Sequence, residues 1–433
     1  MLNSPASSVQ ILGSVSVRRK WSKFLFRWAN ALLFFLVPMN GRIIELVHIE
    51  GGPNLIPISL WLVFLGAILI PSLRFKPVWN NKFFKLFFFL FLLYALSAFW
   101  FNSISEAFEV VSRKLSFIII PFVVFSRPGF YLKEAVFLLR AYGFGILFAL
   151  LLLDIYGLRF YLSNGEIPFY AAYSDVFHPT YLGLNILLFL IAHLYRSARV
   201  QFTWRSGIFY VIIMGALLLH IFLLLSKAII IVTAIVLLYF SVVYARRGWR
   251  NLLVYFSVFL LPFFLIVPVP HLLDKSAEKV KLRFEELTQS KQDNGSTSFR
   301  TLVLKNAPEI IDEHWLFGVG FGNETAYLSQ FYQERGWEHA RSRSFNTHNQ
   351  FLQTWLSIGI GGLFILAILI FGPFMLQISP IVKLMLFSFV FIFCTEAMLE
   401  RLSGIVLFLL FYSLFVGLTH SLKSKRKPRT INI

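Results

Sequence analysis

The chain has little charge and almost no cysteine. Only 14% of its 433 residues are Asp, Glu, Lys or Arg, whereas 58% are hydrophobic; a soluble domain averages about 25% charged and 45–50% apolar residues. The apolar residues also gather in long runs, which excludes an ordinary soluble domain and indicates a membrane protein. The single cysteine, Cys394, excludes a disulfide within the chain and any cysteine-based metal site, and we expect it to be a buried packing residue.

Several functional motifs are missing as well. The sequence holds no P-loop and no Rossmann glycine pattern. His314, His339 and His348 lack the spacing of zinc ligands, so we expect no metal and no other cofactor. No internal repeat of the kind found in transporters is present. The first apolar run is followed by the polar segment 40–42 rather than by a signal-peptide cleavage site, which predicts a retained first span.

The apolar runs predict an all-α, polytopic integral membrane protein with about 12 transmembrane helices. Each run has about 18–22 residues, enough to cross ~30 Å of hydrocarbon. The run 207–244 is too long for one helix, and we divide it at Ser226-Lys227. The predicted spans are 22–39, 55–73, 83–101, 108–126, 134–155, 177–195, 207–225, 226–244, 252–270, 352–376, 380–398 and 402–419.

Connections rich in lysine and arginine alternate along the chain with connections that contain few of them. This alternation predicts which connections lie on which side of the membrane. If the N-terminus lies in the cytoplasm, the inner connections carry most of the basic residues and the outer ones are mainly acidic, as the positive-inside rule requires. Treating 207–244 as one span would place the basic segment 246–250 outside. We therefore expect both termini in the cytoplasm. The same pattern accounts for much of the net charge of +19 without a nucleic-acid partner.

Residues 271–349 form the one long polar interruption, between spans 9 and 10, and lie outside the membrane on the same count. A loop of this length is usually functional. Its pattern predicts short helices, one capped by Ser298 and another over 324–336, with a glycine turn at 318–322 between them. The predicted divisions are 1–270 with spans 1–9, the loop 271–349, and 350–433 with spans 10–12 and a basic tail.

Many ionisable residues are predicted to lie on the outer face. Because a charged side chain near a membrane costs free energy, the presence of each one requires an explanation. Each also has a plain structural interpretation: a solvated helix residue, a helix cap, a side chain snorkelling to the membrane surface, or an i,i+4 cluster at one helix end for Glu396, Glu400 and Arg401. The outer-face residues are His178, Lys227, Arg300, Arg341, Arg343, His348, Glu396, Glu400 and Arg401, with Arg113 and Lys114 nearby.

The functional interpretation combines these residues into one site. Arginine binds phosphate groups through forked donors and lysine through a point charge, so a cationic cluster suits a phosphate or pyrophosphate head group. Histidine, with an ordinary pKa of ~6.5, suits a general base. The cationic cluster and the histidines therefore suit a site that binds an anionic head group and accepts a proton.

Three stretches resemble the O-antigen ligase/polymerase superfamily, whose members are bacterial inner-membrane proteins with many spans and one large periplasmic loop. The stretches are the run from Arg300 through HWLFGVGFGN, then THNQFLQTWLSIGIGGL, and EAMLERLSGIVLFLLF, with a weaker similarity at HPTYLG and LLLSKAIII. In this comparison His348-Asn349 opens the span after the loop, and Gly318 and Gly320 form the family's glycine turn. Lys227 stands where the family usually has arginine.

The resemblance implies a metal-independent, inverting glycosyltransferase that takes a glycan from an undecaprenyl-pyrophosphate donor. A ligase transfers it to lipid A–core, which is the function we expect; a polymerase or a protein O-glycosyltransferase of the same superfamily is the alternative, and a flippase is a further one. The sequence leaves the oligomeric state open. The expected catalytic residues are His348 and Arg300, and the expected substrate-binding residues are Lys227, Arg341, Arg343, His178, Asn349 and Glu396.

Overall fold

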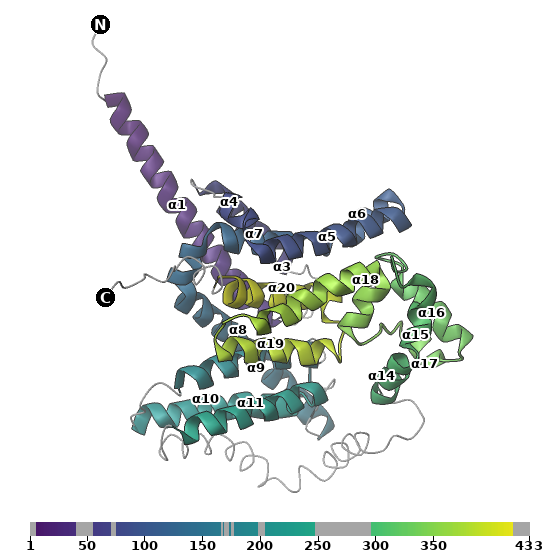
Figure 1. Cartoon of the computed structure of the whole chain (residues 1–433). Helices are drawn as coiled ribbons and strands as arrows, with labels where there is room; N and C mark the ends of the chain where they lie inside the picture. Colours follow the sequence, from purple (N-terminus) through teal and green to yellow (C-terminus); the bar gives the residue numbers. More distant parts are fainter. Residues whose placement is uncertain are drawn as a thin grey trace, which may run out of the picture. The chain divides into compact units, whose positions relative to one another are not determined.

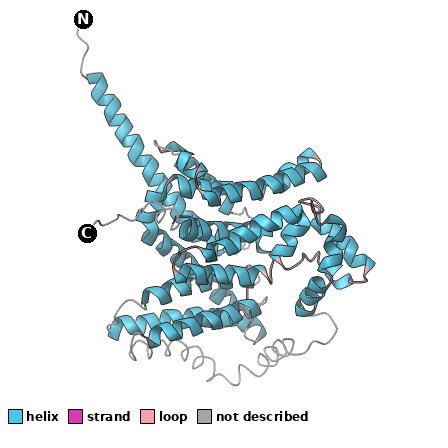
Figure 2. Ribbon diagram, in the orientation of Figure 1, coloured by secondary structure: helices cyan, strands magenta, loops and turns pink. Residues whose placement is uncertain are grey.

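Helices make up all the regular secondary structure in the part of the chain that the computed structural model describes (Figures 1 and 2). The all-α prediction is thereby confirmed for these residues. The predicted span 252–270 and the first part of the loop, 271–295, lie outside them. The described residues are 6–39, 55–70, 75–165, 168, 173–174, 177–197, 204–246 and 296–418.

Five of the described helices are long and apolar enough to cross a membrane, which supports a membrane protein. They are α5 (Lys82–Phe101), α8 (Pro128–Asn164), α10 (Trp204–Leu223), α11 (Lys227–Ala245) and α18 (Gln350–Phe371). Shorter apolar helices are α3 (Leu55–Leu69), α7 (Ser116–Ser126), α19 (Pro380–Phe393) and α20 (Leu402–Phe411), which continues into η5 (Tyr412–Gly417). The division of 207–244 is confirmed, because α10 ends at Leu223 and α11 begins at Lys227.

The chain forms two compact units, and the first comprises 1–88, 115–147 and 406–433. Within it, α1 (Ala6–Leu36) packs on α3, and α7 packs on α3 and α4 (Phe75–Trp79). The polar residues of α1 find partners in α8: Arg27 pairs with Glu134 at 2.9 Å, and the Tyr131 hydroxyl donates to Asn30 at 2.7 Å. These bonds satisfy polar groups that would otherwise be costly among apolar helices.

The second unit comprises 89–114 and 148–405, and its central helix is α9 (Pro179–Ser197). Most side chains of α9 are buried on all sides of the helix, as expected for a helix enclosed by others. It packs against α10, α11 and α19. Pro179 occupies the first helical position, where proline is favoured, and this fixes the start of α9 directly after His178.

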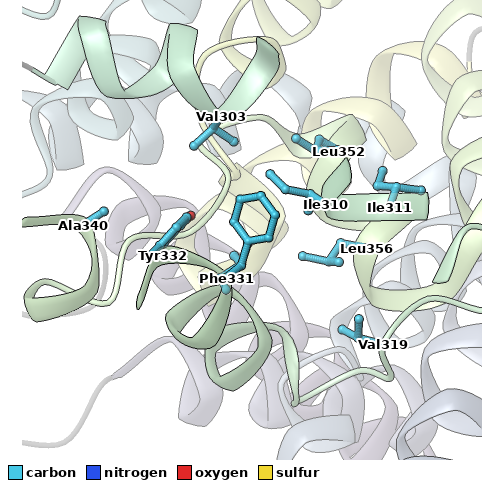
Figure 3. Close-up of a cluster of buried hydrophobic side chains, with 10 residues drawn as sticks. Val303, Ile310, Ile311, Val319, Phe331, Tyr332, Ala340, Leu352 and Leu356 are labelled. Carbon is cyan, nitrogen blue, oxygen red and sulfur yellow. The ribbon is translucent and has the colours of Figure 1, made fainter. Parts of the chain in front are cut away.

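The described part of the polar loop contains four short α-helices, whose buried apolar side chains contribute to one hydrophobic core (Figure 3). The helices are α14 (Ser296–Lys305), α15 (Ala307–Ile311), α16 (Glu324–Glu334) and α17 (Glu338–Ser342). Phe331 of α16 lies among Val303 and Ile310 in this core (Figure 3). Leu352 and Leu356 of α18 belong to the same core, so the loop helices are packed onto the start of α18.

Residues 315–319 run directly against a break in α18. The backbone of α18 leaves helical geometry at Ile358 and Gly359. Trp315 accepts hydrogen bonds at its carbonyl from the Ile360 amide, at 3.0 Å, and from the Trp355 indole, at 2.8 Å. Gly318 has φ +76°, and its Cα lies so close that an added Cβ would stand 2.6 Å from the Leu356 carbonyl oxygen. The predicted glycine turn is therefore present, and close backbone contact requires it.

Some predicted boundaries are wrong. The span 108–126 is not one helix, because α6 (Ile104–Ser112) ends in a turn before α7 begins at Ser116. Ser298 does not cap a loop helix, since α14 already begins at Ser296. Cys394, expected to be buried in a span, is exposed at the end of α19. A polar turn or an early helix end within an apolar run leaves no clear periodic signal.

Substituting Gly318 by alanine should destabilise the protein far more than the same change at Gly336. Both glycines have positive φ, +76° and +69°, which costs an alanine ~1 kcal/mol or more. Only Gly318 also faces backbone, whereas nothing lies within 4 Å of a Cβ at Gly336, so the collision adds ~1–3 kcal/mol. Melting temperatures of the two purified variants in detergent test this. Equal losses would show that the close approach to α18 carries no energetic weight.

Candidate active site

His348 lies in a tightly bonded turn that leads from the loop into α18. Its backbone has φ +48°, a conformation that is uncommon for a residue with a side chain. The His348 amide donates to the Asn346 side chain at 2.9 Å, and the Thr347 hydroxyl donates to Gln353 at 3.0 Å. Asn349 caps α18 by accepting from the Leu352 amide at 3.0 Å. These bonds fix the backbone conformation of the turn that presents the His348 side chain just before α18.

Glu396 joins His348 to Arg300. It lies in the connection 394–401 between α19 and α20, and its side chain is only 5% exposed. One carboxylate oxygen, Oε2, lies 3.3 Å from Arg300 Nη2 and 3.5 Å from His348 Nδ1. The described structure thus brings together the two expected catalytic residues through a third residue that the sequence also singled out.

Electrostatics keep the Glu396 carboxylate ionised. Burial alone would raise its pKa, but the close approach of His348 and the positive charge of Arg300 outweigh burial and lower the pKa below its ordinary value. A buried anion between cationic groups orients those groups in turn. Glu396, expected from the sequence to bind substrate, is therefore in contact with both expected catalytic residues.

His178 lies beside the same group of charges, in the residue that precedes α9. Burial is the main reason that its pKa falls to about 4; Glu396 opposes the shift, whereas Arg401, Arg300 and His348 add to it. His178 is therefore a neutral imidazole at physiological pH. Its Nδ1 is buried without a hydrogen-bond partner among the described residues. Arg401, which helps to lower this pKa, lies over the ring of Tyr181 at 5.8 Å.

Lys227 begins α11 beside the start of α9. The link is a hydrogen bond of 3.1 Å between the hydroxyls of Ser226 and Thr180, the residues next to Lys227 and close to His178. The described structure thus places Lys227 and His178 at neighbouring helix starts.

Three more of the expected substrate-binding residues are Arg341, Arg343 and Asn349. Arg341 pairs with Glu338 at 3.5 Å on α17, and Arg343 is exposed in the turn after that helix. Asn349 uses its oxygen to cap α18 and its Nδ2 to donate to the Cys394 carbonyl at 3.3 Å. Its side chain is thus engaged in holding the start of α18 to the connection 394–401.

Sequence reasoning missed a second buried polar cluster and misjudged its members. Lys114 is 1% exposed and lies 3.1 Å from Glu400, and Glu324 is also buried. The interpretation of Glu396 and Glu400 as an i,i+4 pair on one helix end is wrong, because 394–401 holds only the short 3₁₀ segment Met398–Glu400. The only sequence signal for Glu324 is an acidic residue directly after the glycine turn, at a helix start.

The arrangement can bind an anion and move a proton. Arg300 Nε is buried without a hydrogen-bond partner in the described part of the chain, as is His178 Nδ1, and such groups call for an explanation such as a ligand. The described residues contain no group of three or more His, Cys, Asp or Glu side chains that could hold a metal ion. The available chemistry is that of cationic side chains and imidazoles around one carboxylate.

Comparison with known proteins identifies a family domain in this region. Residues 209–367 match the family model described as O-antigen ligase. The match includes Lys227, Arg300 and His348, whereas His178 and Glu396 lie outside it. It confirms the resemblance to the O-antigen ligase/polymerase superfamily that the sequence motifs indicated. No curated protein gives a significant match to the chain.

Replacing His178 by glutamine should reduce the loss of stability that the protein undergoes as the pH falls below about 6.5. The folded pKa of about 4 lies below the ordinary ~6.5, so His178 contributes its full stability above pH ~6.5 and loses it progressively as the pH falls toward 4. Between pH 6.5 and 5 the loss is about 2 kcal/mol. Melting temperatures across this range should fall less for His178→Gln than for the wild type. Parallel curves would contradict the buried neutral imidazole; His339→Gln, at an exposed histidine, is the control.

Proposed function

We propose, from the O-antigen ligase domain that residues 209–367 carry, that this membrane protein is a glycosyltransferase of bacterial cell-surface glycan assembly. The donor is a glycan on undecaprenyl pyrophosphate, and the acceptor is lipid A–core. The family match supports a ligase- or polymerase-type role and a place in the bacterial inner membrane. The specific donor and acceptor are our inference from the chemistry of the site.

The observation that supports this function best is the sharing of Glu396 between Arg300 and His348. Because Nδ1 of His348 faces the carboxylate, the opposite ring nitrogen, Nε2, is the one that can accept a proton from a substrate. The carboxylate holds the imidazole in this orientation and stabilises the imidazolium that forms, as in other His–carboxylate pairs. Arg300 is held beside this base, where it can meet an anionic leaving group.

The proposed reaction is a single displacement. The acceptor hydroxyl oxygen attacks the anomeric carbon of the donor sugar, its proton passes to His348, and the bond between that carbon and the pyrophosphate oxygen breaks. Arg300 and Lys227 stabilise the negative charge on the departing undecaprenyl pyrophosphate. One displacement inverts the anomeric centre. The bond to pyrophosphate supplies the energy, so the reaction needs no nucleotide.

His178 completes the site as a neutral imidazole. At a pKa of about 4 it carries no charge at neutral pH. It therefore neither competes with Arg300 for phosphate nor repels the Arg300 side chain. A neutral imidazole can donate or accept a hydrogen bond, which suits a sugar hydroxyl. We assign it to orienting the glycan rather than to proton transfer.

The site belongs on the periplasmic face in this proposal, with both termini in the cytoplasm. The positive-inside distribution of charges supports this orientation. The donor and acceptor are both anchored in membrane lipid, so a site beside the starts of α9, α11 and α18 can meet their head groups near the membrane surface. Nucleic acid has no part in the proposed activity.

Alanine at His348 or Arg300 should abolish transfer without removing the protein from the membrane. Loss of a general base costs about 10²–10⁴-fold in rate, and loss of a charged phosphate contact a further ~1.5–3 kcal/mol. Glycan transfer is measured in cells that lack the native protein, with membrane levels checked by immunoblot. Arg113→Ala is the matched control, because Arg113 is exposed and pairs with Glu109, and it should support near-normal transfer. Normal transfer by His348→Ala would refute the assignment of the base.

Lys227 offers a graded test of charge against geometry. Lys227→Arg keeps the charge and adds the forked donors that the family usually has, so kcat/KM should stay the same or rise. Lys227→Met removes the charge, and kcat/KM for the lipid-linked donor should fall about 10–100-fold. Full activity in Lys227→Met would remove Lys227 from the site while leaving His348 and Arg300 in place.

The alternatives differ in what accumulates when the protein is deleted. Loss of a ligase leaves polymerised glycan on the lipid carrier and bare lipid A–core. Loss of a polymerase leaves single repeats attached to lipid A–core, and loss of a flippase leaves lipid-linked units inside the cell. Gel analysis of lipopolysaccharide in a deletion strain distinguishes these outcomes, and only the first agrees with the proposed ligase activity.

A further inference from the structure

Lys114 is a lysine in an apolar site, which calls for an explanation. It lies in the turn after α6, and its side chain is 1% exposed. Its ammonium lies 4.6 Å from the centre of the Tyr94 ring and 5.0 Å from that of Phe321. Burying a charge in this way costs several kcal/mol, and a buried ion pair seldom repays that cost in stability. The position of its hydrogen bonds indicates what it does.

Lys114 holds the connection that carries Glu396. Its ammonium donates to the Leu399 carbonyl at 2.6 Å and to Glu400 at 3.1 Å. The amide of the same Leu399 donates to the side chain of Gln350, in the first turn of α18, at 2.5 Å. Leu399 is therefore bonded on one side to Lys114 and on the other to the helix whose start presents His348.

A buried acid, Glu324, lies near Glu400. It accepts from the Gly322 amide at 2.9 Å and bonds to the Ser357 hydroxyl. Burial and the charge of Glu400 raise the pKa of Glu324 to about 7. Lys114 is thus the cation that compensates Glu400, while Glu324 shares the site by tending to hold a proton. Removing Lys114 would leave the Glu400 carboxylate and the Leu399 carbonyl without the cation that both now contact.

We propose that Lys114 is a positioning residue for glycan transfer: by anchoring Leu399 it sets the distance between Glu396 and His348. This inference rests on the proposed function. Glu396 lies three residues before Leu399 in a connection with little helix of its own, so its position depends on such anchors. Asn349 provides the other anchor by donating to the Cys394 carbonyl. The two anchors, at Cys394 and Leu399, enclose Glu396 between them.

A positioning role predicts a specific kinetic change. Lys114→Met should lower kcat about 100-fold, because a displacement of about 1 Å at a catalytic group costs that much. The KM for the donor should stay within about 2-fold of the wild-type value, since Arg300 and Lys227 still hold the pyrophosphate. The assay uses the full-length protein in nanodiscs with an undecaprenyl-pyrophosphate-linked glycan and lipid A–core. Arg113→Met is the matched control, because Arg113 is exposed and pairs with Glu109, and it should turn over normally.

A double variant separates positioning from simple charge balance. Lys114→Met with Glu400→Gln removes both charges, so it should restore the melting temperature that the single variant loses. It cannot restore the bond to the Leu399 carbonyl, so kcat should remain low. Lys114→Arg keeps a donor for this carbonyl and should recover part of the rate. Recovery of full kcat in the double variant would overturn the proposal, as would wild-type kcat in Lys114→Met.

The single cysteine reports directly on the connection. Cys394 is exposed, so its alkylation by a maleimide follows the mobility of 394–401, and it should be faster in Lys114→Met and in the double variant than in Arg113→Met. Equal rates in all three would overturn the anchoring role. His348→Ala in the same transfer assay keeps the two proposals apart. Normal transfer by His348→Ala refutes the proposed function, whereas an inactive His348→Ala together with a fully active Lys114→Met refutes only the role of Lys114.

Discussion

The second unit of the molecule is built around one buried negative charge. Glu396 would be unstable as an anion at 5% exposure if it stood alone, and the cationic and imidazole groups around it make the charged form favourable. Those groups come from a loop helix, from the start of α18 and from the residue before α9. Three elements that are far apart in the sequence therefore meet near the same carboxylate.

The short connection between α19 and α20 serves two polar clusters at once. Glu396 faces Arg300 and His348, while Glu400, four residues later, faces Lys114. A regular helix would have placed both acids on one side. The irregular backbone directs them into different clusters, and its amide and carbonyl groups bind Gln350 and Lys114. The proposed chemistry and the proposed positioning thus rely on the same eight residues.

Features that depend on local pattern could be predicted from the sequence. Apolar runs and breakers indicated the all-α class, the division before Lys227 and the glycine turn, and motif similarity singled out Arg300, His348 and Glu396. The pairings between them could not be predicted, because Arg300 and Glu396 are 96 residues apart and Lys114 and Glu400 are 286 apart. Lys114 lay inside an apparent span, and nothing local distinguishes a lysine that anchors a carbonyl from one that marks a helix end.

The backbone contact between residues 315–319 and α18 has a mechanical consequence. Trp315 and Val319 are bonded to the backbone or indole of α18 on either side of its break, so this part of the loop moves with α18 as one body. Arg300, by contrast, is joined to Glu396 by a single ion pair at 3.3 Å and is 29% exposed. Separating residues 315–319 from α18 would break several hydrogen bonds. Moving Arg300 away from Glu396 would break one ion pair, which another anion can replace. In the proposed function an incoming pyrophosphate group would replace that ion pair, so we expect the donor to enter on the side of the site that Arg300 occupies.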